Sequence, residues 1–246
     1  MRYLPYRIDP RLAWALDELQ GTKAGDNLLQ RLESLASIAQ PRPEGPALDV
    51  ALGAHRAVIG IAASGIRLTQ AGYLPPAMVR AIAPHLPTMD DWIFPIEREV
   101  HAQPVQRFRE HHIEVGLLRK ASGSLMITAA GRRALGDSTV LWGHIAARLV
   151  PSRRKFDAVA MAIILLHVAT APSRQPHVYT IAESMTALGW RQSTGGPILA
   201  RDVQWPWNNA WGALGCVGTP VGTRALSRIV GQDAVLLIRD ALLVKD

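Results

Sequence analysis

Cysteine is almost absent from the chain, which has only Cys216 among 246 residues. One thiol cannot form an internal disulfide or a cysteine-based zinc site, and such a composition is typical of a reducing compartment. Long apolar runs are also missing. The longest, residues 158–166, extends past His167 to residue 171 and is shorter than the roughly 20 residues of a membrane span. Because the first residues also lack the apolar core of a secretory signal, we expect a cytoplasmic protein without a membrane partner.

Motifs of the common enzyme classes are missing too. The sequence contains no glycine-rich phosphate loop and no serine nucleophile elbow. His111, His112 and Glu114 are close in sequence, but neighbouring helical residues point about 100° apart and converge poorly on one ion. The carboxylate pairs at 90–91 and 97/99 have no nucleophile beside them. We therefore expect neither catalysis, nor a metal site, nor a small-molecule cofactor.

Lysine is scarce: four lysines stand beside 23 arginines, and the net charge is +7. Arginine makes bidentate contacts with phosphate and guanine, which favours a nucleic-acid partner. A GC-rich genome is the alternative explanation, since it also accounts for the many alanines.

The basic surplus is confined to one segment, residues 101–155. That segment has ten basic and three acidic residues, a difference of seven that equals the net charge of the whole chain. The basic residues are Arg107, Arg109, Arg119, Lys120, Arg132, Arg133, Arg148, Arg153, Arg154 and Lys155. A local surplus of this kind favours a polyanionic partner, and double-stranded DNA is the one we expect.

The pattern within this segment predicts a helix, a β-hairpin and a second helix. Val105, Phe108, His112 and Val115 share one face of a helix over 104–115, which Gly116 can cap. Residues 120–123 then form a turn between two short strands. This order of elements is typical of a winged helix-turn-helix.

A short repeat suggests that the arrangement occurs twice. Residues 63–72 resemble residues 121–131, with Ala-Ser-Gly followed by a Thr and an Ala-Gly. Both copies predict a turn, a return strand and a Thr-capped helix. We therefore expect a mostly α protein with short β-hairpins (α+β), built from tandem winged helix-turn-helix-like units. The expected division is an N-terminal helical segment with a proline-rich linker at 1–46, two such units at 47–150, and a degenerate third at 151–246.

Several of these segments resemble a known family. Residues 67–76 (Arg-Leu-Thr-Gln-Ala-Gly-Tyr-Leu-Pro-Pro), 115–119, 126–132 and 187–191 are similar to the helical C-terminal region of actinobacterial proteins in the agrobacterial plasmid ORF-3-like family, some of them labelled insertion-element passenger proteins. The chain lacks the N-terminal domain that defines that family. The resemblance implies winged-helix-like folding and a link to mobile DNA.

The expected DNA contacts come from four places. They are the helix before the hairpin (Arg107, Arg109 and His111, next to His112), the hairpin tip (Arg119, Lys120 and Ser122), the following helix (Arg132 and Arg133) and a basic run (Arg153, Arg154 and Lys155). Three of these places have an alternative explanation. Glu110 and Glu114 lie on the first helix and repel phosphate, and the tip and the basic run also fit an ordinary solvated turn and connection.

The function we expect is non-catalytic binding of double-stranded DNA, as a transcriptional or mobile-element regulator. The alternative is a protein–protein interaction module that uses the same units without contacting DNA. A homodimer is compatible with both, since the tryptophans at 205, 207 and 211 fit a core or a dimer contact as well as base stacking.

Overall fold

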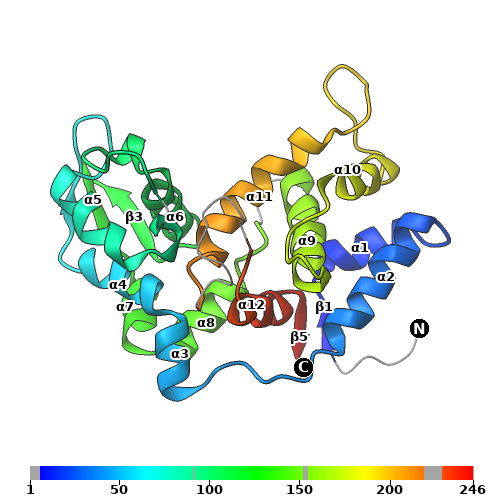
Figure 1. Cartoon of the computed structure of the whole chain (residues 1–246), viewed down its shortest axis with the longest axis horizontal. Helices are drawn as coiled ribbons and strands as arrows, with labels where there is room; N and C mark the ends of the chain where they lie inside the picture. The colour runs from blue at the N-terminus through cyan, green and yellow to red at the C-terminus, as the bar shows by residue number, and fades with distance from the viewer. Residues whose placement is uncertain (1–5, 91, 152–154, 219–228, 246) are drawn as a thin grey trace. The chain divides into compact units, whose positions relative to one another are not determined.

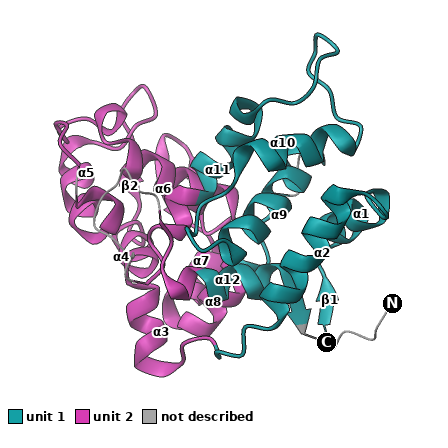
Figure 2. Cartoon of the chain, turned by 45° about the vertical axis from the view of Figure 1, so that its right-hand side comes forward, with its two compact units in different colours: residues 1–41, 146–210, 235–246 teal, residues 42–145, 211–234 magenta. Residues whose placement is uncertain are grey.

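The computed structural model describes residues 6–90, 92–151, 155–218 and 229–245 (Figure 1). Over these residues the protein is mostly helical, with twelve α-helices and two small antiparallel sheets, which confirms the expected mostly helical α+β class. The chain forms two compact units, coloured separately in Figure 2. Unit 1 comprises residues 1–41, 146–210 and 235–246, and unit 2 comprises residues 42–145 and 211–234.

Unit 1 is organised around helix α9 (Lys155–Thr170), the apolar run of the sequence. Its residues from Ala158 to Val168 are all buried, and a helix that is apolar on every side needs neighbours on every side. It contacts α1 (Pro10–Glu18), α2 (Lys23–Ala36) and α10 (Val178–Ala187). α9 is therefore a core helix, and no helix of the described part of the chain is long and apolar enough to cross a membrane.

The two ends of the described chain meet in unit 1. Strand β1 (Tyr6–Ile8) pairs antiparallel with β5 (Leu243–Lys245), which directly follows α12 (Gln232–Leu242). Neither strand was expected from the sequence, and α12 begins directly after Gly231. Strands this short have little sequence signature, because their partner lies more than 200 residues away.

Unit 2 contains the basic segment up to α8. In chain order its elements are α3 (Gly45–Ala51), α4 (Gly53–Ile61), β2 (Ile66–Arg67), α5 (Pro76–Ile82), the 3₁₀ turns η1 (Ala83–His85), η2 (Pro87–Met89) and η3 (Glu99–His101), α6 (Gln103–Glu114), β3 (Leu118–Ala121), β4 (Ser124–Ile127), α7 (Ala129–Gly136) and α8 (Ser138–Ala146). The C-terminal end of α11 (Ala200–Leu214) also belongs to it.

A three-stranded antiparallel sheet joins distant segments of unit 2. Strand β4 is central: it pairs with β3 in the expected hairpin and with β2 on its other side. Ile66, Leu118, Leu125 and Ile127 are buried on one face of this sheet. Since β2 and β4 are 57 residues apart at the Arg67–Ser124 pair, the sheet fixes the N-terminal helices of the unit to the hairpin.

The expected duplication is wrong, because the two copies have different structures. In the second copy, Thr128 caps α7 by accepting from the Gly131 N–H, as predicted. In the first copy, Thr69 lies in a closed turn, where its N–H bonds the Tyr73 carbonyl, and Gly72 has φ +78°. Pro75 and Pro76 then start a separate helix, since proline is favoured at the first helical positions. Both segments belong to one sheet, so the described residues of 47–150 hold one hairpin and not two.

The units are also discontinuous, whereas the sequence predicted three consecutive segments. The changes of unit at 41/42 and 145/146 fall close to the expected boundaries at 46 and 150. The region after 150 does not form a unit of its own, because α9 and α10 pack with the N-terminal helices. A buried helix such as α9 does not indicate from its own sequence which segments will cover it.

Candidate nucleic-acid interface

Helix α6 is packed more deeply than its sequence indicates. The predicted face is confirmed: Val105, Phe108 and His112 are completely buried and Val115 is nearly so. Proline at its second position suits a helix start, and Gly116, with φ +77°, follows its end. The buried surface also extends beyond the apolar face and includes two of the residues that were expected to contact DNA.

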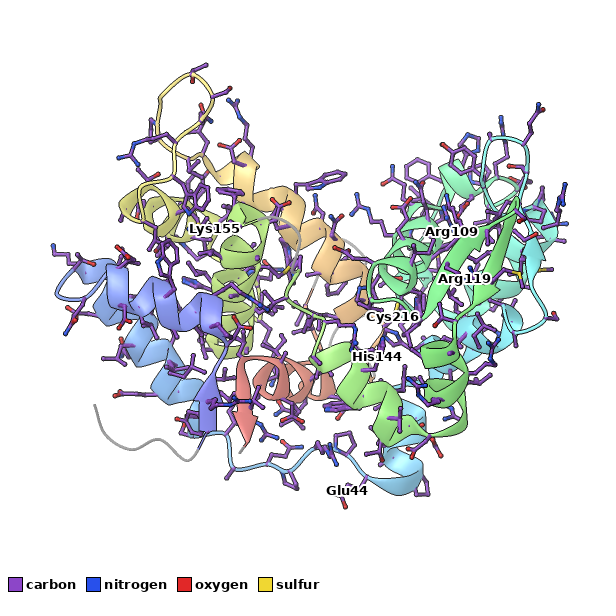
Figure 3. The ribbon with its side chains drawn as sticks, turned by 180° about the vertical axis from the view of Figure 1, so that it is seen from behind. Glu44, Arg109, Arg119, His144, Lys155 and Cys216 are labelled. Carbon is purple, nitrogen blue, oxygen red and sulfur yellow. The ribbon has the colours of Figure 1, made fainter. Side chains whose placement is uncertain are left out.

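Arg109 is the first of these, with 2% of its surface exposed. Its Nε donates to Oε1 of Glu99 at 2.6 Å, and Glu99 is itself 1% exposed. The other carboxylate oxygen of Glu99 accepts from the Leu74 N–H at 2.7 Å. This ion pair therefore ties α6 to η3 and to the chain before α5 (Figure 3 labels Arg109). A guanidinium that is buried and paired in this way cannot reach a phosphate, so the expectation that Arg109 contacts DNA is wrong.

His111 is the second, and it belongs to a cluster with His55 and His112 in which the ring centres lie 5.1 to 6.1 Å apart. The Phe108 carbonyl accepts from Nδ1 of His112 at 2.7 Å, which leaves Nε2 of His112 to accept from Nδ1 of His55 at 3.3 Å. Burial lowers the pKa of His111 to about 3, helped by His112, and the pKa of His112 to about 4. Burial also lowers the pKa of His55 well below its usual value.

These three rings are therefore neutral core residues at neutral pH. His111 supplies no positive charge to a DNA surface, which corrects the second expectation for α6. No group of three or more His, Cys, Asp or Glu side chains within the described ranges is arranged to hold a metal ion.

The solvent face of α6 is acidic. Gln103, Glu110 and Glu114 are its exposed residues, and the Gln106 amide donates to Glu110 at 3.0 Å. Arg107 is half-buried on the same helix. With two exposed carboxylates and one half-buried guanidinium, this face repels phosphate.

The β3–β4 hairpin has the opposite character. Ser122 and Gly123 form a two-residue turn with φ values of 48° and 70°, the left-handed backbone of a type I′ turn. Both residues of the tip are exposed, and so are Arg119 and Lys120 on β3 (Figure 3 labels Arg119). Lys120 is opposite Leu125 in register, and its ammonium donates to the Gly72 carbonyl at 3.3 Å.

Strand β2 adds a cation that the sequence did not single out. Arg67 is exposed and lies opposite Ser124, while Arg119 lies opposite Met126. Because side chains alternate along a strand, Arg67, Arg119, Ser124 and Met126 share the face of the sheet that is turned away from Leu125 and Ile127. One feature of the sequence could have identified this surface: residues 63–74 and 117–135 contain no Asp or Glu.

Arg132 and Arg133 are exposed on α7, directly after the sheet. Gly131 precedes them because α7 approaches the preceding chain closely, and a Cβ there would lie 2.2 Å from the Leu117 carbonyl oxygen. The two acid-free stretches therefore contain five exposed cations: Arg67, Arg119, Lys120, Arg132 and Arg133. We call Arg67, Arg119 and Lys120 the sheet cations.

The expected basic run at 153–155 is described only in part. Arg153 and Arg154 lie outside the described residues. Lys155 is the first residue of α9 in unit 1, and its ammonium lies 5.2 Å from the centre of the Trp14 ring, a cation–π contact. Of the three tryptophans at 205, 207 and 211, Trp205 is 64% exposed, whereas the other two are buried.

Comparisons with known proteins add no assignment. No family model, no curated protein and no solved structure matches this chain.

Proposed function

We propose that unit 2 binds double-stranded DNA without catalysis, using the sheet cations and the hairpin rather than the face of α6. The observation that carries this proposal is the acid-free sheet surface, where exposed Arg67 and Arg119 share one face. Cations without neighbouring carboxylates interact with phosphates at full strength, and such contacts supply most of the affinity for DNA backbone.

The element order of unit 2 supports a winged-helix-like arrangement. Helix α4, strand β2, helices α5 and α6 and the β3–β4 hairpin follow one another, with β4 between the other two strands. One difference from a typical helix-turn-helix affects how unit 2 would bind DNA. Residues 83–102 separate α5 from α6, in place of the short turn of a helix-turn-helix.

This departure, together with Glu110 and Glu114, argues against insertion of α6 into the major groove. The interaction would then be made mostly with the DNA backbone and would have little sequence preference. The proposal includes a role as a transcriptional or mobile-element regulator. The family resemblance supports it only through the link to mobile DNA.

The test measures binding of the full chain to a random-sequence duplex by fluorescence anisotropy at a series of salt concentrations. Log affinity should fall with log salt concentration with a slope of about −4, as expected when roughly five phosphates are neutralised. Replacing Arg67 and Arg119 together by Ala should make the slope shallower by about two. Both side chains are exposed, so the fold should not change.

The matched control is Lys23→Ala with Arg201→Ala, which removes the same charge from exposed positions of unit 1. It should leave the slope almost unchanged. A slope near zero for the wild type would reject the proposal, and an equal loss in both double variants would show that only net charge matters.

A protein partner is the second candidate, and one observation favours it. Ile93 and Phe94, in the connection before η3, are 87% and 59% exposed. Exposed apolar groups beside polar ones are typical of protein-binding surfaces. If the wild type does not bind DNA at low salt, a protein partner becomes the favoured function of unit 2.

A further inference from the structure

Unit 2 contains a pocket at the beginning of α6 that the proposed DNA contact does not use. Trp92 and Trp211 line it as indole walls, and Pro104 adds an apolar ring. Gln103 and Arg107, from the first two turns of α6, and Thr88 of η2 add polar side chains. The cavity volume is about 80 Å³.

The wall of this pocket depends on a close approach of two helices. Gly212 of α11 faces Arg107 of α6, and a Cβ at Gly212 would lie 3.2 Å from the Arg107 Cβ. Gly215, one turn later, also packs tightly, since a Cβ there would lie 2.8 Å from Cγ2 of Thr88. The absence of side chains at these two glycines lets the end of α11 lie against α6 and η2, with Trp211 at the cavity.

The electrostatics of the pocket favour an anion. Arg107 is cationic, and no acidic side chain lines the cavity among the residues that the structure describes. Helix α6 begins at Gln103 without a side-chain cap, so its first peptide N–H groups give this end a partial positive charge. The indole N–H of Trp92 is buried and has no acceptor among the described residues, and a ligand oxygen would satisfy it.

The size and the walls favour one flat ring. An enclosed apolar cavity of about 150 Å³ holds benzene, so an open pocket of about 80 Å³ takes at most one ring, partly exposed at the mouth. Indole walls and a proline ring suit the face of such a ring. A polar group on the ring would then meet Arg107 and Gln103.

From these observations we propose that the pocket between the start of α6 and the end of α11 binds a small ligand made of one planar ring and a carboxylate. The ring packs against Trp92 and Trp211, and the carboxylate accepts hydrogen bonds from Arg107. The proposal does not depend on DNA binding.

The experiment uses the full chain labelled with ¹⁵N and follows the indole N–H signals by NMR. The Trp92 signal is assigned from its loss in the Trp92→Phe variant. Three probes separate the two requirements: benzoate has ring and carboxylate, benzyl alcohol has the ring alone, and acetate has the carboxylate alone. Benzoate should shift the Trp92 signal with a dissociation constant on the order of 1 mM, as expected for so small a ligand. The other two should bind about tenfold more weakly.

One variant tests the role of the guanidinium. Arg107→Gln removes the charge and should weaken benzoate binding by about tenfold or more. The matched control Arg80→Gln changes an exposed arginine of α5 in the same unit and should leave binding unchanged. Trp205→Phe, at an exposed tryptophan outside the pocket, is the control for Trp92→Phe. The overall spectrum of each variant reports whether the fold is intact.

Equal affinity for benzoate and benzyl alcohol would overturn the proposal, and so would unchanged benzoate binding by a folded Arg107→Gln variant. Absence of any Trp92 shift at about 10 mM benzoate, ten times the expected dissociation constant, would also overturn it.

Discussion

Helix α6 and the β3–β4 hairpin are neighbours in sequence, and each contains two cationic residues of the basic segment. The two elements differ in how far these side chains are exposed to solvent. In α6 the guanidinium of Arg109 and the rings of His111 and His112 are buried, and the exposed face is acidic. In the hairpin Arg119 and Lys120 are exposed, and their sheet has no carboxylate. A count of charges along the chain cannot separate a core residue from a contact residue, because burial depends on what packs against each helix or strand.

The largest expected effect concerns the histidines on the α6 side. In the unfolded chain they take up protons below about pH 6.5, whereas folded His111 and His112 stay neutral until about pH 3 and 4. The unfolded state therefore binds more protons between pH 6.5 and 4, and the free energy of unfolding falls as the pH falls through this window. Each histidine should cost about 2 kcal/mol between pH 7 and pH 5, so His111, His112 and the similarly buried His167 together should cost the wild type about 6 kcal/mol.

Urea denaturation of wild type and His111→Leu at both pH values measures this. The variant should lose about 2 kcal/mol less than wild type on acidification. His167 of α9, whose pKa burial lowers to about 3, contributes equally to both proteins and cancels in the difference. An identical loss in wild type and variant would mean that His111 is not held neutral, and it would restore this residue as a charged surface group.

The buried ion pair gives the next effect. Glu99→Gln leaves the Arg109 guanidinium buried without its carboxylate and should lower the free energy of unfolding by about 3–5 kcal/mol. Glu99→Gln with Arg109→Met should cost clearly less than the sum of the two single changes, since no unpaired charge remains. Urea denaturation at pH 7 measures all three proteins.

Arg119→Met is the matched control on the hairpin, where an exposed arginine should change stability by less than about 0.5 kcal/mol. If Arg109→Met proved equally harmless, the contrast between the buried helix and the exposed hairpin would be lost.

The smallest expected effect concerns the exposed face of α6. If DNA contacts the sheet and not this helix, replacing Glu110 and Glu114 by Gln should raise DNA affinity only modestly, by about threefold or less at roughly 0.15 M salt, through screened long-range repulsion. Fluorescence anisotropy on the random duplex measures the change. An increase of a hundredfold would place phosphates next to α6 and shift the interface toward the helix first expected from the sequence.

Much of the local structure could be predicted from short-range chemistry. The face of Val105, Phe108, His112 and Val115 follows from helical spacing, and the Ser-Gly turn of the hairpin follows from the backbone it requires. Arg109 could not be assigned in this way. Its partner Glu99 lies in a connection with no regular pattern, and an arginine next to Glu110 and outside the apolar face resembles an exposed one.

Arg67 was overlooked for a related reason. Strand β2 has only two residues and pairs with β4 across 57 positions, so no local pattern places Arg67 beside the hairpin. The repeat pointed to residues 63–72 but suggested a second unit instead of a third strand. Likewise, the pocket at the start of α6 needs Trp211 from the far end of α11, and nothing in the segment around Trp92 predicts that contact.

The sequence by itself determined the helical class, the hairpin, the long apolar run that becomes α9 and the basic character of residues 101–155, because these depend on spacing, turn chemistry and composition within a few residues. The tertiary structure decided which cations are exposed, that both Ala-Ser-Gly segments share one sheet, and that α9 packs with the N-terminal helices. Those properties depend on contacts between segments tens to hundreds of residues apart, where the free energy of burial, ion pairing and strand pairing depends on the partner as much as on the residue itself.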